Sequence, residues 1–320
     1  MPGTLIIAEA ADGAVAPHSF ELLAAGRALA DQGGGAVSAL IAGDESLAQS
    51  LFAHGADAVY LAPAGSLDPG YAETGAGAAL AACEAADADV VLMGQTSVGR
   101  DLGPLMAFKL NTAVAMECVG LTLDGGRLRA TRSCYGGNAN AEVTWRGDVQ
   151  IATLKPKAWD ALAPDDGRSG TVTAIDATGE QRVRVVSTEA AEATGIRLED
   201  AEVVVSGGRG LGDPSAFGMM EELSGLLGGA TGASRAACDL GWYPPSQQVG
   251  LTGKTVTPNL YIAVAISGAS QHMAGMSGSK NIVAVNRDPD CNMVQVSRFA
   301  VVEDYKKVVP ALIEAIKALD

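Results

Sequence analysis

A glycine-rich turn in the C-terminal third contains the first residues that could do chemistry. Ser206-Gly-Gly-Arg-Gly-Leu-Gly212 follows an apolar run of strand length and precedes a segment with helical spacing. Glycines at such a turn allow backbone N–H groups to approach a phosphate at the start of a helix. Their spacing differs from Gly-x-Gly-x-x-Gly, so it does not indicate a standard nicotinamide-binding fingerprint.

Polar residues follow the next two expected strands. His272 lies in Ser267-Gly-Ala-Ser-Gln-His-Met273, after one strand and at the start of a short helix, and Asn286 ends the following strand. A single histidine at such a position is often a capping residue, but the turn also directs N–H groups toward an anion. Because ligands bind at the carboxyl ends of strands in open α/β sheets, these residues together predict a large, elongated, phosphate-bearing ligand.

Two glycine-bearing segments between them resemble sites of other kinds. Gly250-Leu-Thr-Gly-Lys-Thr255 is similar to the end of a P-loop, but Gln248 occupies the position of the first glycine, and prolines stand where the strand and helix should be. Gly232-Ala-Ser-Arg-Ala236 resembles a serine nucleophile elbow, but only His272 lies downstream as a histidine partner. Neither a nucleotide hydrolase nor a serine hydrolase is therefore indicated.

In their order and spacing, these segments resemble the alpha subunit of electron transfer flavoproteins. The matching segments are GGRG at 207–210, GASRA at 232–236, QVGLTGKTV at 248–256, LYIAVAISGASQHMAGM at 260–276 and NIVAVNRDP at 281–289. Residues 89–104 and the Tyr135–Asn138 turn resemble the family more loosely. The sequence departs from the family pattern at Ala265, where glycine is usual, and at Arg287, where lysine is frequent.

The resemblance implies FAD as the cofactor. Carried over position by position, the residues implied to bind it are Arg209, Ser234, Arg235, Gln248, Val249, Gly250, Leu251, Thr252, Ser267, Gly268, Ala269, Ser270, Gln271, His272, Asn286 and Asp304. Arg235 would lie against the isoalloxazine ring, Thr252 would hydrogen-bond flavin N5, and His272 would face O2. Gln271 and Ser267 would serve the pyrophosphate and ribityl region, and Asn286 and Asp304 the ADP end.

The family further implies an electron carrier rather than a substrate-transforming enzyme. As the alpha subunit of a heterodimer, the chain would accept electrons from flavoprotein dehydrogenases, as in fatty acid β-oxidation, and pass them singly to a quinone oxidoreductase or another acceptor. A guanidinium and an imidazole beside the ring would stabilise the anionic semiquinone. No acid–base pair is required, so no catalytic residue is predicted. The beta subunit would carry AMP or, in bifurcating members, a second FAD.

Two alternatives remain open at this point. The same fold could support a flavin-dependent reductase of small molecules, and the first domain taken alone would fit a nucleotide-binding regulatory module.

The elements that must position these residues are those of an α/β protein with two domains. Near the N-terminus, apolar runs of strand length alternate with helical segments, which predicts a parallel sheet buried on both faces. The expected strands and helices are 4–8, 36–42, 58–62 and 89–94, and 21–31, 46–54 and 71–86. Between 114 and 187, β-prone runs separated by turn residues predict antiparallel strands that extend this sheet or form a small appended unit. These runs are 127–134, 142–145, 150–154, 171–175 and 182–186.

The alternation restarts after an acidic, alanine-rich stretch at 188–198. Strands are expected at 202–206, 261–267 and 281–286, and helices at 214–227, 269–276 and 303–319. We therefore expect residues 1–190 to form a scaffold domain that docks the beta subunit, and residues 191–320 to form a Rossmann-like, doubly wound FAD-binding domain. The stretch at 188–198 is expected to act as a linker about which the second domain swivels.

Composition excludes several other classes of function. The net charge of −15 argues against a nucleic-acid partner, since a phosphate-binding face requires clustered lysine and arginine. Five widely spaced cysteines without CxxC and three scattered histidines indicate neither a disulfide framework nor a metal site. The longest apolar run is about half of the ~20 residues that a membrane span needs, and the N-terminus has no basic signal region. A cytoplasmic protein is expected.

Overall fold

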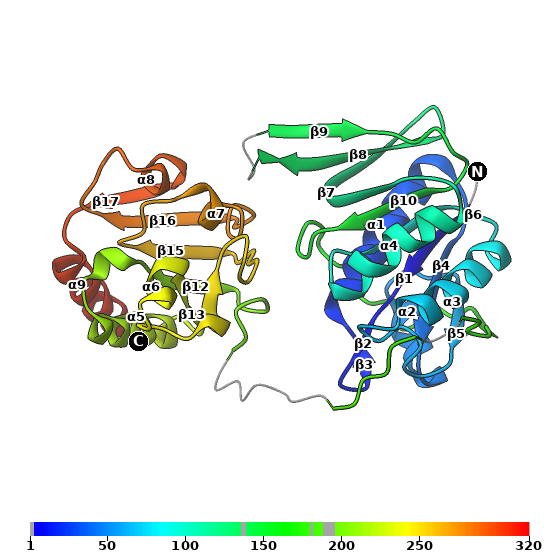
Figure 1. Cartoon of the computed structure of the whole chain (residues 1–320), viewed down its shortest axis with the longest axis horizontal. Coiled ribbons are helices and arrows are strands. Elements are labelled where there is room, and N and C mark those ends of the chain that lie inside the picture. Colours follow the sequence, from blue (N-terminus) through cyan, green and yellow to red (C-terminus); the bar gives the residue numbers. More distant parts are fainter. Residues whose placement is uncertain (1–2, 136–138, 180–181, 188–195, 320) are drawn as a thin grey trace. The chain divides into compact units, whose positions relative to one another are not determined.

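The computed structural model of the chain describes residues 3–135, 139–179, 182–187 and 196–319 (Figure 1). The chain divides into two compact units, one comprising Met1–Cys134 and Ala139–Thr188 and the other Tyr135–Asn138 and Glu189–Asp320. Residues 188–195, which include most of the expected linker, and residues 136–138 of the Tyr135–Asn138 turn lie outside the described residues.

The first unit is built on a nine-stranded sheet with the strand order β11-β5-β4-β1-β6-β10-β7-β8-β9. Its strands are β1 (Gly3–Ile7), β4 (Val37–Ala42), β5 (Ala58–Ala62), β6 (Ala88–Gly94), β7 (Val114–Asp124), β8 (Arg127–Cys134), β9 (Ala139–Val143), β10 (Gln150–Leu154) and β11 (Thr171–Ala174). A two-stranded hairpin, β2 (Ala10–Ala11) and β3 (Ala14–Val15), follows β1.

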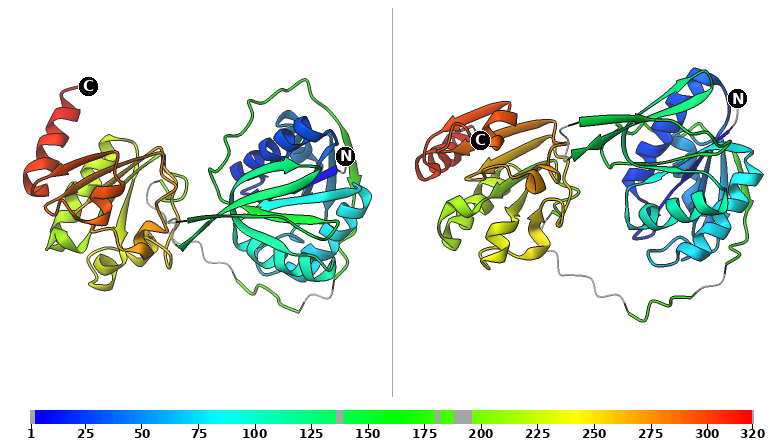
Figure 2. Two further views of the ribbon diagram at one scale, coloured as in Figure 1. Left: turned by 90° about the horizontal axis from the view of Figure 1, so that it is seen from above. Right: turned by 45° about the horizontal axis from the view of Figure 1, so that its top comes forward.

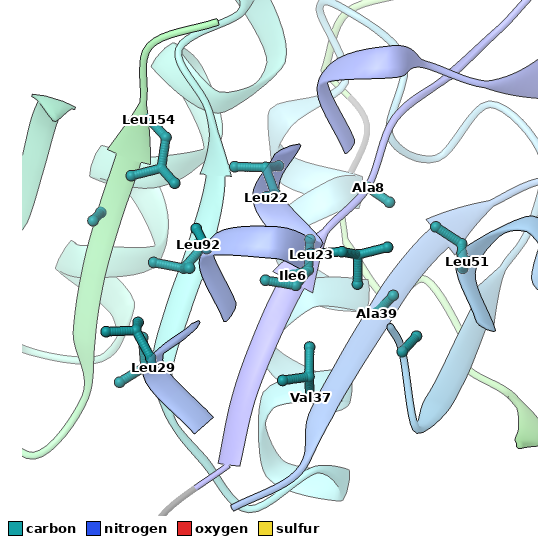
Figure 3. Packing of buried hydrophobic residues seen from close by; sticks show 14 of the residues in the cluster. Ile6, Ala8, Leu22, Leu23, Leu29, Val37, Ala39, Leu51, Leu92 and Leu154 are labelled. Atoms are coloured by element: carbon teal, nitrogen blue, oxygen red, sulfur yellow. The ribbon is translucent and has the colours of Figure 1, made fainter. Parts of the chain in front are cut away.

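Helices cover both faces of this sheet, and successive residues of β1 show why. Ile6 packs with Leu22 and Leu23 of α1 (Pro17–Gly33), whereas Leu5 and Ile7 belong to the core on the opposite face (Figure 3). The alternation follows from the two-residue period of a strand. The other helices are α2 (Ala48–Ala53), which joins α1 on the first face, and α3 (Ala72–Ala85) and α4 (Ser97–Lys109), which cover the second.

Among the expected runs, the antiparallel prediction is correct for 127–134, which forms β8, and for 142–145, which overlaps β9. β8 also pairs antiparallel with β7, a strand that was not predicted. The prediction was wrong for β10, which is parallel to both β6 and β7, and for β11, which is parallel to β5. All five residues of β10 are buried, as expected for a strand covered on both faces within a parallel region. After β10 the chain runs to the far edge of the sheet and adds β11 there (Figure 2).

The expected strand at 182–186 does not form. Residues 182–187 are exposed and have no regular structure, because this stretch pairs with no strand among the residues that the structure describes. The backbone N–H of Val185 instead donates to the hydroxyl of Tyr71 at 3.2 Å.

The second unit is a six-stranded parallel sheet with the order β14-β13-β12-β15-β16-β17. Its strands are β12 (Val203–Gly207), β13 (Ala230–Ser234), β14 (Gln248–Val249), β15 (Leu260–Val264), β16 (Asn281–Asn286) and β17 (Phe299–Val302). Renumbered from one within the unit, this is the 3-2-1-4-5-6 order of the dinucleotide-binding doubly wound fold, which confirms the expected fold class. The strand order reverses between β12 and β15.

Two cores enclose this sheet. On one face, α5 (Phe217–Leu226) and α9 (Tyr305–Lys317) contribute Met220, Leu223, Val309 and Ile313, and α6 (Arg235–Asp239) adds Ala237. The other face packs Met276 and Met293 with the fully buried Tyr261. The short helices α7 (Ser270–Met273) and α8 (Asn292–Val296) lie at strand ends. Strands β13, β14 and β17 are additions to the predicted set, and the helix expected at 269–276 is shorter.

Candidate functional site

A cavity of about 580 Å³ lies at the carboxyl ends of the strands of the second unit, at the point where the strand order reverses. This volume falls within the roughly 300–1,000 Å³ of small-molecule sites, and the position is where doubly wound sheets bind ligands. Fourteen of the sixteen residues named from the sequence line it: Arg209, Ser234, Arg235, Gln248, Val249, Gly250, Leu251, Thr252, Ser267, Gly268, Ala269, Gln271, His272 and Asn286.

The glycines after β12 are required by packing as well as by any ligand. A Cβ on Gly208 would lie 2.2 Å from the carbonyl oxygen of Ala265, and one on Gly210 would lie 2.8 Å from the same atom. Ala265 itself has φ of +55°, in the left-handed region that favours glycine. The carbonyl of Ala265 therefore packs closely against the glycines of the loop after β12. This close contact between the loops after β12 and β15 brings Arg209 and Ser267 to the same cavity.

Charge around the cavity differs in sign from that of the whole chain. Among the described residues that line it, the charged side chains are three arginines and two carboxylates, Arg209, Arg235, Arg287, Asp239 and Glu303. Their sum, three positive and two negative, is one positive charge, against −15 for the chain. This concentration of guanidinium groups in an acidic protein fits a ligand that carries phosphates.

The arginines differ in what holds them. Arg235 Nε lies 3.4 Å from an oxygen of Asp239, one helical turn later, and both side chains are about two-thirds exposed. Arg287 Nη1 lies 3.6 Å from an oxygen of Asp304. Exposed pairs of this kind are weak, so either guanidinium can turn to a ligand at small cost.

The loop after β14 is held by hydrogen bonds within itself and to the turn after β15. The Gln248 Nε2 group donates to the Thr252 hydroxyl at 3.0 Å, and the Leu251 N–H donates to the Gln271 carbonyl at 2.7 Å. Gly250 has φ of +147°, and its backbone lies so close to Gly275 that a Cβ on Gly275 would meet it at 2.4 Å. The loop is thus seated on the turn that carries Gln271 and His272.

His272 lies in the wall of the cavity but is itself buried. Its Nε2 is 2.9 Å from the hydroxyl of Tyr261, while Nδ1 is buried and makes no hydrogen bond of normal geometry in the described part of the chain. Burial lowers the pKa of His272 to about 4, opposed by the backbone of Val249, so the imidazole is neutral near pH 7. Both nitrogens of this conformer are therefore directed to the protein interior.

The remaining residues named from the sequence act at the margin of the cavity. Asn286 lines it, but its Nδ2 donates to the Ile266 carbonyl at 2.9 Å and its Oδ1 accepts from the Asp288 N–H at 3.0 Å. Ser270 and Asp304 are the two that lie outside the lining. The Ser270 hydroxyl donates to Gln271 Oε1 at 3.3 Å, and Asp304 caps α9 by accepting from the Lys306 N–H at 3.0 Å.

Several lining residues were missed from the sequence. The polar ones are Asp239, Arg287, Glu303 and Tyr305, and the others are Gly208, Gly210, Ala236, Ala265, Ile266 and Val285. Two had a usable local signal, since Asp239 is four residues from Arg235 on a helix and Arg287 directly follows Asn286 at a strand end. Tyr305 is positioned by helix α9, and no local pattern in the sequence indicates that this helix reaches the cavity.

The reversal point of the first unit, between β1 and β6, is occupied by side chains. The Thr96 hydroxyl donates to the Glu9 carboxyl at 2.6 Å across it, and burial raises the pKa of that carboxyl. A buried carboxyl there disfavours an anionic nucleotide.

The described residues contain no cluster of three metal-ligating side chains and no helix long and apolar enough to cross a membrane.

Comparisons with known proteins show the family to which the chain belongs. The family model "Electron transfer flavoprotein domain" matches residues 4–180, and "Electron transfer flavoprotein FAD-binding domain" matches residues 197–277. The chain is 40% identical to electron transfer flavoprotein subunit alpha of Thermoanaerobacterium thermosaccharolyticum, covering 98% of this chain and 97% of that protein. It is 37% identical to the subunit alpha of Bacillus subtilis, at 99% and 98% coverage, and 35% identical to Protein FixB of Clostridium saccharobutylicum, at 99% and 97% coverage. The chain therefore belongs to the alpha-subunit family of electron transfer flavoproteins, and its C-terminal unit is an FAD-binding domain of that family.

Proposed function

We propose that this chain is the alpha subunit of a heterodimeric electron carrier and that it holds FAD in the cavity of its second unit. The observation that carries the proposal is the convergence of fourteen residues named from sequence on one cavity with an excess of guanidinium groups. When bound, FAD supplies redox chemistry by one or two electrons, and the protein supplies orientation and charge.

The arrangement of side chains supports distinct roles along the cavity. Arg235, on the first turn of α6, is proposed to lie against the flavin ring, where its permanent charge favours added electrons. Thr252 is proposed to donate to flavin N5. Gln271 and Ser267 would serve the pyrophosphate and ribityl region, and Asn286, with Asp304 acting through Arg287, the ADP end.

His272 is proposed to lie at the O2 side of the ring as an uncharged group. Because both of its nitrogens point into the protein in this conformer, the positive charge that favours reduction would come from the arginines of the cavity rather than from an imidazolium.

The proposed partners follow from the family and the two-domain organisation. Residues 1–190 would dock a beta subunit that carries AMP or a second FAD, and residues 191–320 would carry the redox cofactor. Flavoprotein dehydrogenases, such as those of fatty acid β-oxidation, would supply the electrons, and a quinone oxidoreductase or another acceptor would receive them one at a time. We place this carrier in the cytoplasm, with bifurcation possible where the beta subunit holds a second flavin.

The test is to purify the chain together with its beta subunit. A yellow heterodimer that releases FAD on denaturation, and that accumulates a red one-electron-reduced flavin during photoreduction, is the expected result. A colourless complex that fails to take up added FAD would overturn the proposal. Direct passage to the two-electron-reduced flavin, with turnover of a small-molecule oxidant, would instead favour a reductase on the same fold.

A further inference from the structure

A short segment before β12 lies against the loop that follows β14. Leu198 in this segment is 2% exposed and belongs to the same buried apolar cluster as Val249, the last residue of β14. A Cβ on Gly232 would lie 3.0 Å from a methyl group of Val249 and 3.4 Å from one of Leu198, so both side chains reach the same point beside β13. The next residue, Glu199, forms an ion pair with the amino group of Lys254. The segment is therefore attached to the loop at both of its ends.

Lys254 is the residue that closes this loop. Its N–H donates to the Gln248 carbonyl at 2.7 Å, and its own carbonyl accepts from the Gly250 N–H at 3.1 Å. A Cβ on Gly253 would lie 2.3 Å from the Gln248 carbonyl oxygen, so the chain turns back on itself with no room for a side chain there. Thr252 lies within this closed turn, two residues before Lys254. The direction of the Thr252 hydroxyl therefore depends on where Lys254 is held.

We propose that Glu199 is a positioning residue: through its ion pair with Lys254 it holds the closed turn, and with it the Thr252 hydroxyl, at the wall of the cavity. The effect on the flavin rests on the proposed function, whereas the hold on the turn does not. Neither Glu199 nor Lys254 is among the described residues that line the cavity, so we expect the pair to act through the turn. Their side chains are 40% and 43% exposed, so solvent screens the pair, and a modest effect is expected rather than loss of FAD.

The neighbouring carboxylate, Asp200, has a different partner. Its Oδ2 lies 2.6 Å from Nε of Arg197, within the same segment. The N–H groups of Asp200 and Ala201 both donate to the Arg197 carbonyl at 3.1 Å, so the segment is itself a turn. This turn directs Glu199 to the loop and Asp200 to its own segment. Asp200→Asn is therefore a matched control, because it removes the same charge from the adjacent position without breaking a contact with Lys254.

The direct test is amide hydrogen exchange in the heterodimer, for wild type, Glu199→Gln and Asp200→Asn. The N–H groups of Gly250 and Lys254 should exchange roughly two- to fivefold faster in Glu199→Gln, the size that a partly exposed ion pair supports. In Asp200→Asn they should exchange at the wild-type rate. Equal rates in wild type and Glu199→Gln would overturn the proposal. This comparison works with or without FAD, so failure of the proposed function would be seen separately, as an absence of flavin in the wild-type heterodimer.

A reversed ion pair supplies the second arm, measured with FAD. Glu199→Gln should weaken FAD binding roughly two- to fivefold and shift the flavin absorption spectrum. Lys254→Glu, which places two carboxylates face to face, should have the larger effect. Adding Glu199→Lys to Lys254→Glu restores an ion pair with the net charge of wild type, and should return affinity and spectrum toward the wild-type values.

Two results of this arm would refute the positioning role. One is a double variant no better than Lys254→Glu alone, because the ion pair would then not carry the effect. The other is faster exchange in Glu199→Gln with unchanged FAD affinity and spectrum, because the turn would then be held by Glu199 without any consequence for Thr252.

Discussion

The side chain of Gln248 donates to the hydroxyl of Thr252 across the loop that follows β14, with 3.0 Å between Nε2 and Oγ1. Gln248 is 9% exposed, whereas Thr252 is exposed where the loop lines the cavity. A hydroxyl that accepts one hydrogen bond keeps its own proton for another acceptor. The buried glutamine therefore presets Thr252 as a donor toward the cavity, which is the role that a contact with flavin N5 requires.

Replacing Gln248 with Met should weaken this contact without emptying the site. Methionine conserves the length of the side chain but cannot donate, so the Thr252 hydroxyl would lose its fixed orientation. We expect FAD to bind less tightly by about 0.5–1.5 kcal/mol, the net value of one hydrogen bond, and the flavin spectrum to shift. Titration of the apoprotein heterodimer with FAD measures both.

A double-mutant cycle with Thr252→Val shows whether the two residues act together. If Gln248 acts through Thr252, the double variant should lose little more affinity than Thr252→Val alone. Strict additivity of the two losses would contradict the coupling. Thr252→Ser, which keeps the hydroxyl, is the control that should remain near wild type.

Ala265→Gly should stabilise the protein. Ala265 has φ of +55°, and the left-handed conformation costs a residue with a Cβ about 1–2 kcal/mol. Glycine removes this strain, but it also gives the unfolded chain more conformational entropy, which cancels part of the stabilisation. We expect a net gain of roughly 0.5–1 kcal/mol in the free energy of unfolding, measured by urea denaturation of the FAD-loaded heterodimer.

Ala263→Gly is the matched control, within β15 and two residues before Ala265. Ala263 is 1% exposed, so its loss removes a buried methyl group and adds backbone freedom, and it should destabilise the protein. Equal destabilisation by both substitutions would show that the conformation of Ala265 carries no strain.

Much of this site was predictable because its signals are local. Ser206–Gly212 and Ser267–His272 combine an apolar run, a glycine turn and a helical segment within a few residues, and the alternation of such units predicts a doubly wound sheet. Strand β13, with the sequence Ala-Thr-Gly-Ala-Ser, has weak β-propensity. It is a strand because β12 and β14 pair on either side of it.

Pairing between distant segments was the part that the sequence concealed. β10 follows the antiparallel strands β7, β8 and β9 in the sequence, but its five buried residues lie between β6 and β7 and are parallel to both. The acceptor of the Tyr305 hydroxyl, the Leu211 carbonyl at 2.6 Å, is likewise 94 residues away. No rule based on local residue spacing predicts a contact between residues this far apart in the sequence.

Arg235→Ala should lower the flavin potential while FAD largely remains bound. Removing a charged donor beside the ring costs the reduced flavin about 1.5–3 kcal/mol, which corresponds to a shift of order 100 mV for one electron. Spectroelectrochemical titration measures this shift. Arg298→Ala is the control, because Arg298 contacts Asn281 at 2.8 Å and lies outside the residues that line the cavity. An unchanged potential in Arg235→Ala would refute its place against the ring.

Asp239→Asn should act in the opposite direction and more weakly. Asp239 is the ion-pair partner of Arg235 and is about two-thirds exposed, so solvent screens most of its effect. Its neutralisation leaves the guanidinium unopposed and should raise the potential by a fraction of the Arg235→Ala shift. A lowered flavin potential in Asp239→Asn would indicate that Asp239 mainly positions Arg235, rather than weakening the effect of its positive charge on the flavin.

Glu9→Gln should stabilise the first unit at neutral pH and not at low pH. Burial raises the pKa of Glu9 above its ordinary value of 4.5, so the folded protein holds this proton more tightly than the unfolded chain does. The contribution of the protonated Glu9 side chain to the stability of the fold is then fully present below pH 4.5. It is lost as the pH rises through the pKa that Glu9 has in the folded protein. Glutamine removes the buried charge and still offers an oxygen to the Thr96 hydroxyl.

The expected result is a higher stability of Glu9→Gln at pH 7 that vanishes toward pH 4, in thermal unfolding followed across that range. Glu21→Gln is the contrasting variant, because the Glu21 carboxylate lies 3.0 Å from Nδ1 of His18 and accepts from the Lys157 N–H at 2.6 Å. There the charge is paired, so its loss should destabilise the unit. If Glu9→Gln instead destabilised the protein at neutral pH, the ionised carboxylate would have to be the form that holds β1 and α4 together, and burial would not be the dominant influence on Glu9.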